Sequence, residues 1–239
     1  MSQAEYLESY DPEAYPRPSV TVDLVLMTIV DGQLAALLQQ RPVQPFQGDW
    51  ALPGGFVGIK EGLDDAARRV LDQKAHIPDA YVEQLYTFGA PDRDPRTRVI
   101  TVVYFALLPA ERFAASLKSS ADLMLAELVI PWEGETGGSV TACGEDGTEL
   151  PLAFDHAEII ALAVKRLRGK LDYSEVGFAL LPERFTLRQL QDVHEAILGT
   201  RFNKPAFRRR MLDKGRIEGT GERETGASFR PAELYQRKD

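Results

Sequence analysis

The sequence predicts an α+β protein made of two domains: an α/β/α sandwich followed by a small C-terminal domain of two helices and a β-hairpin. Two observations predict the first domain: alternating apolar residues from Ser19 onward, and an apolar, β-branched run from Val99 to Leu108. A third observation, two capped helical patterns close together after residue 180, predicts the second. We place the domains at residues 1–172 and 173–239.

Composition and charge limit the possible functions of the chain. It has 239 residues, of which 44% are hydrophobic and 27% charged, and Cys143 is its only cysteine. The first residues are acidic and no run is long enough to span a bilayer, so we expect a cytoplasmic protein without a membrane partner. The net charge is −8, yet residues 200–239 hold 11 Lys and Arg against 6 Asp and Glu. This basic end is either a solvated face or a surface that meets a polyanion.

The expected elements of the first domain follow one another in a regular order. A strand begins at Ser19, turns at Asp31-Gly32 and pairs with a partner over residues 34–38. The glycine-containing loop 50–56 precedes a helix over 63–74. The buried strand 99–108 comes next, and five glycines in 133–147 predict a turn-rich excursion. Asp155 can cap a final helix whose apolar face includes Ile160, Val164 and Leu167, with Gly169 near its end.

One spacing in the first domain is specific enough to suggest a family. Gly55, Glu61, Arg69, Leu71 and Ile77 occupy the positions of a Nudix box, and Leu-Pro-Gly-Gly precedes them as residues 52–55. The chain therefore resembles a Nudix domain. It departs from the pattern where that family has three glutamates and a glycine; these positions are Val70, Gln73, Lys74 and His76. Nudix hydrolases hold Mg²⁺ on this helix face, and the ion requires oxygen ligands that valine and lysine do not supply.

The altered box is compatible with three interpretations: a hydrolase with substituted ligands, an inactive scaffold, or an inactive fold that binds a nucleotide. Glu61, Asp64, Asp65 and Asp72 remain as possible substitute ligands, although the helix dipole accounts for the two aspartates of the first turn. The three histidines lack metal-binding spacing, and no nucleophile has a base beside it in the sequence. We predict no catalytic residue, no metal ligand, no cofactor and no enzyme activity.

Candidate ligand-binding residues surround the glycine loop and the loop before Val99. Arginines there can grip phosphate, aromatic side chains can stack on a base, and an ammonium on the box helix can replace part of the charge of a metal ion. Each residue type has a plainer role as a polar connection, a core aromatic residue or a solvated lysine. The candidates are Arg41, Trp50, Gly54, Gly55, Phe56, Lys74, Arg93, Arg96 and Arg98.

The C-terminal pattern predicts a winged helix-turn-helix. Thr186 and Gln189 form a capping box, and Gly199 ends the helix that follows. Asn203 caps a second helix that Gly215 stops, and two strands around a polar tip follow it. Basic side chains on such a helix and hairpin reach bases or phosphates of double-stranded DNA. The predicted DNA-binding residues are Thr186, Arg188, Asn203, Lys204, Arg208, Arg209, Arg210, Arg223 and Arg230.

The two halves together resemble the Nudix-related transcriptional regulators of NAD metabolism. The resemblance rests on the glycine loop with its altered box, on Phe154-Asp-His156, and on residues 180–187 through 207–210. It implies a homodimer that binds a palindromic operator, represses genes of NAD synthesis or salvage, and is released by ADP-ribose or a related nucleotide. Two alternatives stay open: a Nudix hydrolase that cleaves ADP-ribose or a related diphosphate, and a regulator whose effector is NAD or a phosphorylated sugar.

Overall fold

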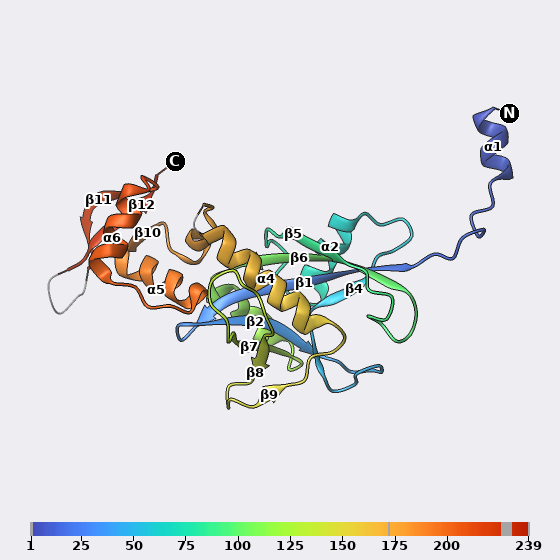
Figure 1. The fold of residues 1–239 in the computed structure, drawn as a ribbon, viewed down its shortest axis with the longest axis horizontal. Coiled ribbons are helices and arrows are strands. Elements are labelled where there is room, and N and C mark those ends of the chain that lie inside the picture. Colours follow the sequence, from blue (N-terminus) through green and yellow to red (C-terminus); the bar gives the residue numbers. More distant parts are fainter. Residues whose placement is uncertain (1, 172, 226–230, 239) are drawn as a thin grey trace.

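The computed structural model describes residues 2–171, 173–225 and 231–238. The sheet domain forms the middle of an elongated molecule, the C-terminal domain lies at one end, and helix α1 (Gln3–Ser9) projects from the other end (Figure 1). Among the described residues, no helix is both long enough and apolar enough to cross a membrane.

The first domain is built on a mixed sheet with the order β5-β6-β1-β2-β7-β8-β9. Its central pair, β1 and β6, is parallel, whereas β1 and β2 form the predicted hairpin, with positive φ at Asp31 and Gly32. Short strands β3 and β4 pair with β2 and β1 and position the glycine loop. The strands are β1 (Ser19–Val30), β2 (Gln33–Gln40), β3 (Trp50–Ala51), β4 (Gly54–Phe56), β5 (Glu83–Phe88), β6 (Val99–Leu107), β7 (Leu123–Val129), β8 (Thr141–Cys143) and β9 (Glu149–Leu150).

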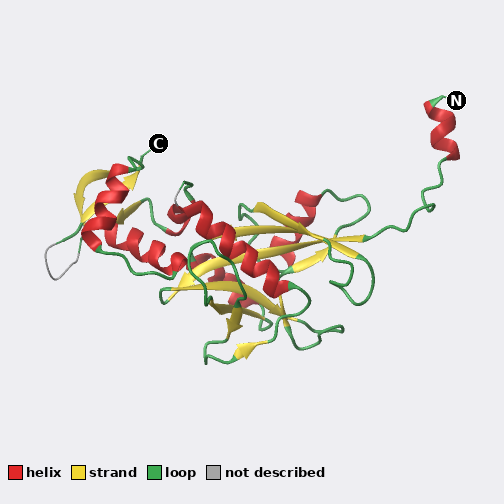
Figure 2. Ribbon diagram, in the orientation of Figure 1, coloured by secondary structure: helices red, strands yellow, loops and turns green. Residues whose placement is uncertain are grey.

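Helices cover both faces of this sheet, which confirms the predicted sandwich (Figure 2). Helix α2 (Leu63–Gln73), the predicted box helix, packs on one face through Ala66, Ala67, Val70 and Leu71. The 3₁₀ segment η1 (Ala110–Phe113) contributes the buried ring of Phe113 to the same core, and α3 (Ala114–Ser119) follows it. Helix α4 (His156–Leu171) covers the opposite face with an apolar stripe that is fully buried.

The C-terminal domain is a winged helix, as predicted. Its elements are η2 (Val176–Leu180), β10 (Arg184–Thr186), α5 (Leu187–Leu198), α6 (Lys204–Asp213), β11 (Ile217–Arg223) and β12 (Glu233–Arg237). The capping box of Thr186 and Gln189 is present, Gly199 has a φ of 68°, and Asn203 caps α6. The three-stranded order β10-β12-β11 adds a strand that the sequence pattern did not predict. The second wing strand was expected from Phe229, which lies outside the described residues.

Helix α4 ends at Leu171, so Gly169 lies near its end, as predicted. One expectation about α4 was wrong. The carboxylate of Asp155, expected to cap α4, instead receives two hydrogen bonds from Arg93. In addition, Val193 and Ile197 of α5 belong to the same hydrophobic core as α4, so the two domains share one packed region. The boundary between residues 172 and 173 stays a prediction.

Candidate functional site

Two arginines and three phenylalanines meet where the loop after β2, the β5–β6 loop and the start of α4 come together. The guanidinium carbon of Arg41 lies 4.8 Å from the ring centroid of Phe154, and that of Arg96 lies 5.8 Å from the same ring. Arg96 also lies 5.5 Å from the ring of Phe56, and Phe46 packs edge-on against Phe154 at 4.8 Å. We refer to these five residues as the cation–aromatic cluster.

The backbone at this cluster is strained. Phe46 and Phe154 have φ values of 61° and 56°, in the left-handed region that residues other than glycine rarely adopt. Such strain persists only where the surrounding contacts enforce it, and it concentrates at functional sites. An open pocket of about 380 Å³ lies directly beside the cluster and is lined in part by both phenylalanines, Arg93 and Asp155.

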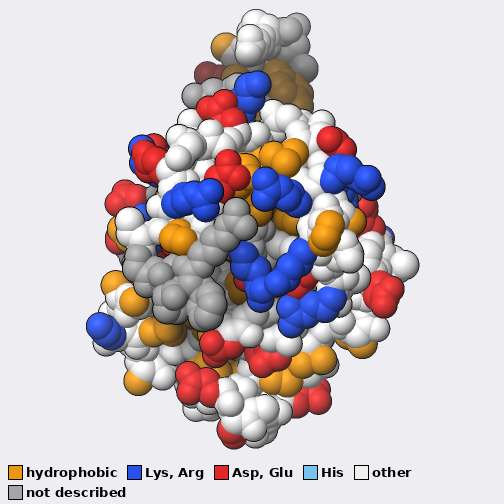
Figure 3. All heavy atoms as spheres, turned by 90° about the vertical axis from the view of Figure 1, so that its left-hand side faces the viewer, with side chains coloured by type: hydrophobic (Ala, Val, Ile, Leu, Met, Phe, Trp, Pro, Cys, Tyr) orange, Lys and Arg blue, Asp and Glu red, His pale blue; other side chains and the backbone are white. Residues whose placement is uncertain are grey.

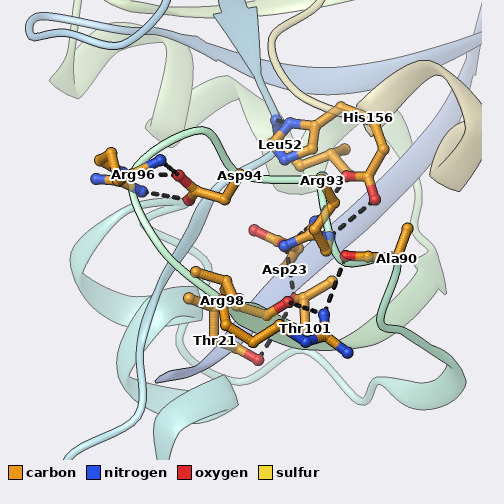
Figure 4. Close-up of polar contacts among 12 residues, drawn as sticks. Thr21, Asp23, Leu52, Ala90, Arg93, Asp94, Arg96, Arg98, Thr101 and His156 are labelled. Carbon is orange, nitrogen blue, oxygen red and sulfur yellow. Dashed lines mark hydrogen bonds and ion pairs between the residues drawn. The ribbon is translucent and has the colours of Figure 1, made fainter. Parts of the chain in front are cut away.

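Below the cluster, a buried polar network holds its supporting loops in place (Figure 4). Arg93 donates two hydrogen bonds to Asp155, at 2.8 and 2.6 Å, and its guanidinium lies 3.9 Å from Asp23. Asp23 accepts a 2.6 Å hydrogen bond from the Thr101 hydroxyl. These contacts connect β1, β6 and the 90–98 loop to the residue that precedes α4. The network therefore fixes the position of Phe154.

Gly54 and His156 fit closely against this network. A β-carbon on Gly54 would lie 2.0 Å from the Asp23 carboxylate, so only glycine is accommodated there. The Nδ1 atom of His156 accepts a 2.9 Å hydrogen bond from the Leu52 amide. Burial lowers the pKa of His156, which keeps the imidazole neutral and able to accept this bond. His156 is therefore a structural residue that ties the glycine loop to α4.

The charges of the cluster favour an anion. The pKa of Arg41 is lowered, first by burial and then by repulsion from Arg96. Asp94 compensates for part of this charge: it accepts hydrogen bonds from Arg96 at 2.7 and 3.0 Å, which lower the pKa of its own carboxyl group. Two guanidinium groups held close to each other beside an open pocket suit a ligand with phosphate oxygens.

The box helix presents a different environment. The side chain of Val70 is buried in the core and lies 3.5 Å from the position that a β-carbon on Gly55 would take. Three of the carboxylates considered as substitute metal ligands are held by other side chains, at distances of 2.7 to 2.9 Å. The pairs are Glu61 with Arg69, Asp64 with Tyr104, and Asp65 with Arg68. The arrangement does not fit a Mg²⁺ site of the Nudix type, and no group of three His, Cys, Asp or Glu side chains suited to a metal ion occurs among the described residues.

The predicted ligand-binding residues divide by location. Arg41, Phe56 and Arg96 come together in the cluster, whereas Arg93 lies beneath it and is bonded to Asp155. Gly54 and Gly55 support the network and the box helix. The other three make different contacts: Trp50 packs against the core under α4, and Arg98 donates a hydrogen bond to the Ala90 carbonyl. Lys74 lies at the end of α2. Hydrogen bonds from Ser120 and Gln39 lower the pKa of the nearby Asp122 carboxyl group, and the charge of Lys74 lowers it further by a smaller amount.

Sequence reasoning did not assign Phe46, Phe154 or Asp23 to the site. Asp23 gives a signal, since it is a charged residue within the apolar alternation of β1. Phe154 stands immediately before a predicted helix, but the sequence carries no sign of its positive φ. Its contacts come from segments far away along the chain, which local patterns do not reveal.

The second candidate site is the basic face of the winged helix. Lys and Arg side chains gather on the end of the molecule that this domain forms (Figure 3). Lys204, Arg208 and Arg209 are exposed along α6, and Arg208 lies 3.6 Å from Glu233 of the wing. Arg223 is also exposed and bonds the Pro231 carbonyl. This face offers a helix and an adjacent hairpin, the arrangement that places a helix in the major groove.

Three predicted DNA-binding residues stand apart from that face or have another role. Thr186 is buried as the cap of α5, and Asn203 uses its side chain to cap α6. Arg188 pairs with Asp192 and lines a groove next to the β1–β2 turn of the first domain. Arg230 lies outside the described residues.

Comparisons with known proteins identify both domains. The NUDIX domain family matches residues 18–127, and the family described as the NrtR DNA-binding winged helix domain matches residues 177–236. The chain is 37% identical over 237 residues to the ADPR responsive transcriptional repressor NtrR of Acinetobacter baylyi, covering 98% of this chain and 88% of that protein. Such a pairing of domains defines a DNA-binding transcriptional regulator.

Solved structures lead to the same family. Shewanella oneidensis NrtR complexed with a 27mer DNA aligns with a TM-score of 0.72 and 39% identity, covering 92% of this chain and 93% of that one. The NUDIX domain of the same protein, complexed with ADP ribose, aligns with a TM-score of 0.52 and 36% identity, covering 70% and 99%. The chain belongs to the NrtR family.

Proposed function

We propose that ADP-ribose, or a closely related nucleotide, binds at the cation–aromatic cluster and lowers the affinity of the winged helix for operator DNA. The observation that carries this proposal is the placement of Arg41 and Arg96 within 6 Å of the Phe154 ring, beside a pocket. Guanidinium groups bind a diphosphate bidentately, and the exposed aromatic side chains of Phe46 and Phe56 can stack on a base.

The names of the relatives support this choice of ligand and its effect. The Acinetobacter protein is described as an ADPR responsive repressor, and the Shewanella domain was solved with ADP ribose. From the family resemblance, we propose that the regulated genes are those of NAD synthesis or salvage. The regulator is a homodimer on a palindromic operator, since two winged helices about one DNA turn apart match a two-fold symmetric site.

The proposed regulator binds its effector without hydrolysing it. Val70 lies in the core, and three of the four remaining carboxylates are engaged in the hydrogen bonds described above. A sensor that leaves its ligand intact can follow the concentration of that ligand. The ligand shifts DNA binding only if it binds two arrangements of the protein with different affinity.

An equilibrium titration tests the proposal. Fluorescently labelled DNA from upstream of the protein's own gene neighbourhood is bound to the protein. ADP-ribose is then added while the fluorescence anisotropy of the DNA is followed. We expect ADP-ribose to weaken DNA binding by a factor within about 5 to 150, the usual range for coupled sites. Arg96→Gln should shift the titration to higher ADP-ribose concentrations. Unchanged DNA binding at saturating ADP-ribose would contradict the proposal.

A thermal-shift panel separates the effector alternatives. ADP-ribose, NAD and ribose 5-phosphate are each tested over a concentration series, because a specific ligand raises the apparent Tm in proportion to the logarithm of its concentration. We expect the largest shift with ADP-ribose. A larger shift with NAD or with the phosphorylated sugar would replace ADP-ribose as the effector.

A further inference from the structure

A buried arginine joins the two domains at the end of α4 opposite to the cation–aromatic cluster. Arg168 is only 4% exposed. Its Nε donates a 2.8 Å hydrogen bond to the carbonyl of Ile197 in α5, and its Nη1 donates a 2.6 Å bond to the carbonyl of Trp132. The guanidinium carbon also lies 4.5 Å from the Trp132 ring. One side chain of α4 therefore contacts both the 132–134 loop and the winged helix.

The contact with α5 occurs at a position that suits a cation. Ile197 is the next-to-last residue of α5, so its carbonyl has no partner within the helix and carries part of the negative end of the helix dipole. Gly199 follows with a positive φ, and a β-carbon there would lie 3.3 Å from the Arg168 guanidinium. The chain is shaped closely around this contact.

Helix α4 connects Arg168 to the effector site. Phe154 of the cluster lies two residues before His156, the first residue of α4, and Asp155 and His156 are fixed by Arg93 and by the Leu52 amide. The helix runs from there across the sheet to α5 (Figure 1). Its stripe of Ile159, Ile160, Ala163, Val164 and Leu167 is fully buried. Such a helix moves as a rigid unit, because its packed side chains resist gradual deformation.

Helix α5 belongs to two cores at once. Val193 and Ile197 pack with α4, whereas Leu190 packs with Phe207 of α6. Glu195 fixes the turn to α6 by accepting a 2.9 Å hydrogen bond from the Phe202 amide. A displacement of α4 that carries α5 with it is therefore passed to α6 and its basic residues.

A buried charge costs free energy, and an apolar contact would hold the two helices together without that cost. The hydrogen bonds of Arg168 instead define one position of α5 relative to α4. We propose that Arg168 is the positioning residue that transmits effector binding from the cation–aromatic cluster to the DNA-binding helix. This inference rests on the proposed function, because it specifies how the same ligand acts on DNA binding.

The test compares Arg168→Met with Arg166→Met, a matched change on the exposed side of α4. Methionine replaces the arginine with an unbranched apolar side chain, which still fills space but cannot make the hydrogen bonds to Ile197 and Trp132. For each full-length protein, calorimetry measures ADP-ribose affinity without DNA, and anisotropy measures DNA affinity with and without saturating ADP-ribose. We expect Arg168→Met to keep the wild-type affinity for ADP-ribose alone and for DNA alone. The ratio of its DNA affinity without ADP-ribose to that with ADP-ribose should fall at least tenfold or reach unity. Arg166→Met should keep the wild-type ratio.

The outcomes separate the inference from the proposed function. If ADP-ribose does not change the DNA affinity of the wild-type protein, the proposed function itself is wrong. A folded Arg168→Met protein with the wild-type ratio would overturn only the role of Arg168. Hydrogen exchange on the wild-type protein gives a second measurement should the variant fail to fold. ADP-ribose should change the protection of amides in 194–201, and an unchanged segment in a protein that releases DNA would overturn the inference.

Discussion

Helices α2 and α4 cover opposite faces of one sheet, and they differ in what their ends contact. Helix α2 carries the Nudix box, yet Val70 lies in the core and Arg69 bonds Glu61 and the Phe56 carbonyl. Helix α4 carries no part of the Nudix box and begins at His156, the last residue of the Phe154-Asp-His156 segment. It begins beside the cation–aromatic cluster, and its last turn contacts the winged helix through Arg168.

Under the proposed function, a retained motif marks the fold without marking the ligand-binding site. In α2, the remaining box residues stabilise the loop that precedes the helix. In α4, ordinary helix residues provide a long, buried connection between the cluster and α5. The contrast between a structural helix and a transmitting helix leads to four predictions.

The largest expected effect comes from restoring the first missing carboxylate of the box. Val70→Glu places an unpaired charge in a packed core, so we expect the free energy of unfolding to fall by about 3 to 5 kcal/mol. Urea denaturation measures the change. Gln73→Glu, on the exposed side of the same helix, should change stability by less than about 0.5 kcal/mol. A well-folded Val70→Glu protein with Mg²⁺-dependent hydrolysis would show that α2 is more than a structural helix.

Removing a guanidinium from the cluster should weaken ligand binding strongly. Arg41→Gln and Arg96→Gln each remove hydrogen bonds between charged groups and the ligand, with an expected loss of about 1.5 to 3 kcal/mol of binding free energy. Calorimetry with ADP-ribose provides the measurement. Arg68→Gln on α2 is the matched control, and equal losses for all three variants would remove the distinction between the two helices.

The ion pair between Arg69 and Glu61 should stabilise the fold at neutral pH but not in acid. The hydrogen bond from Arg69, followed by that from the Gly58 amide, lowers the pKa of Glu61 to about 2. The pKa of a glutamate in the unfolded chain is about 4.3. This pair therefore stabilises the fold above that pH, and its contribution is lost as the pH falls through about 2. The stability difference between wild type and Glu61→Gln should therefore shrink from pH 5 toward pH 2. A difference that is constant across this range would mean that the pair does not stabilise the fold.

The smallest effect is expected at Lys74. It is exposed at the end of α2, and its contribution to an anionic ligand would act through solvent. Lys74→Ala should weaken ADP-ribose binding by no more than about twofold. An affinity equal to that of the wild type would remove Lys74 from the site, whereas a tenfold loss would place the ligand over α2 instead of beside α4.

Local signals predicted much of the fold. The caps at Thr186 and Asn203 and the turn at Asp31-Gly32 depend on neighbouring residues, and all three are present. The cluster was predicted only in part. Arg41 and Arg96 were expected to bind a ligand, but their meeting at Phe154 depends on the folding of distant segments. The pairing of Arg93 with Asp155 is equally non-local, and it engages the Asp155 carboxylate that was expected to cap α4.

The central claim is that this domain senses its ligand without consuming it. The most direct measurement follows the anisotropy of a protein–operator complex over time after ADP-ribose and Mg²⁺ are added, and then quantifies AMP in the same sample. The account predicts that DNA is released, stays released, and that ADP-ribose remains intact. Release that reverses as AMP accumulates, or no release at all, would contradict it.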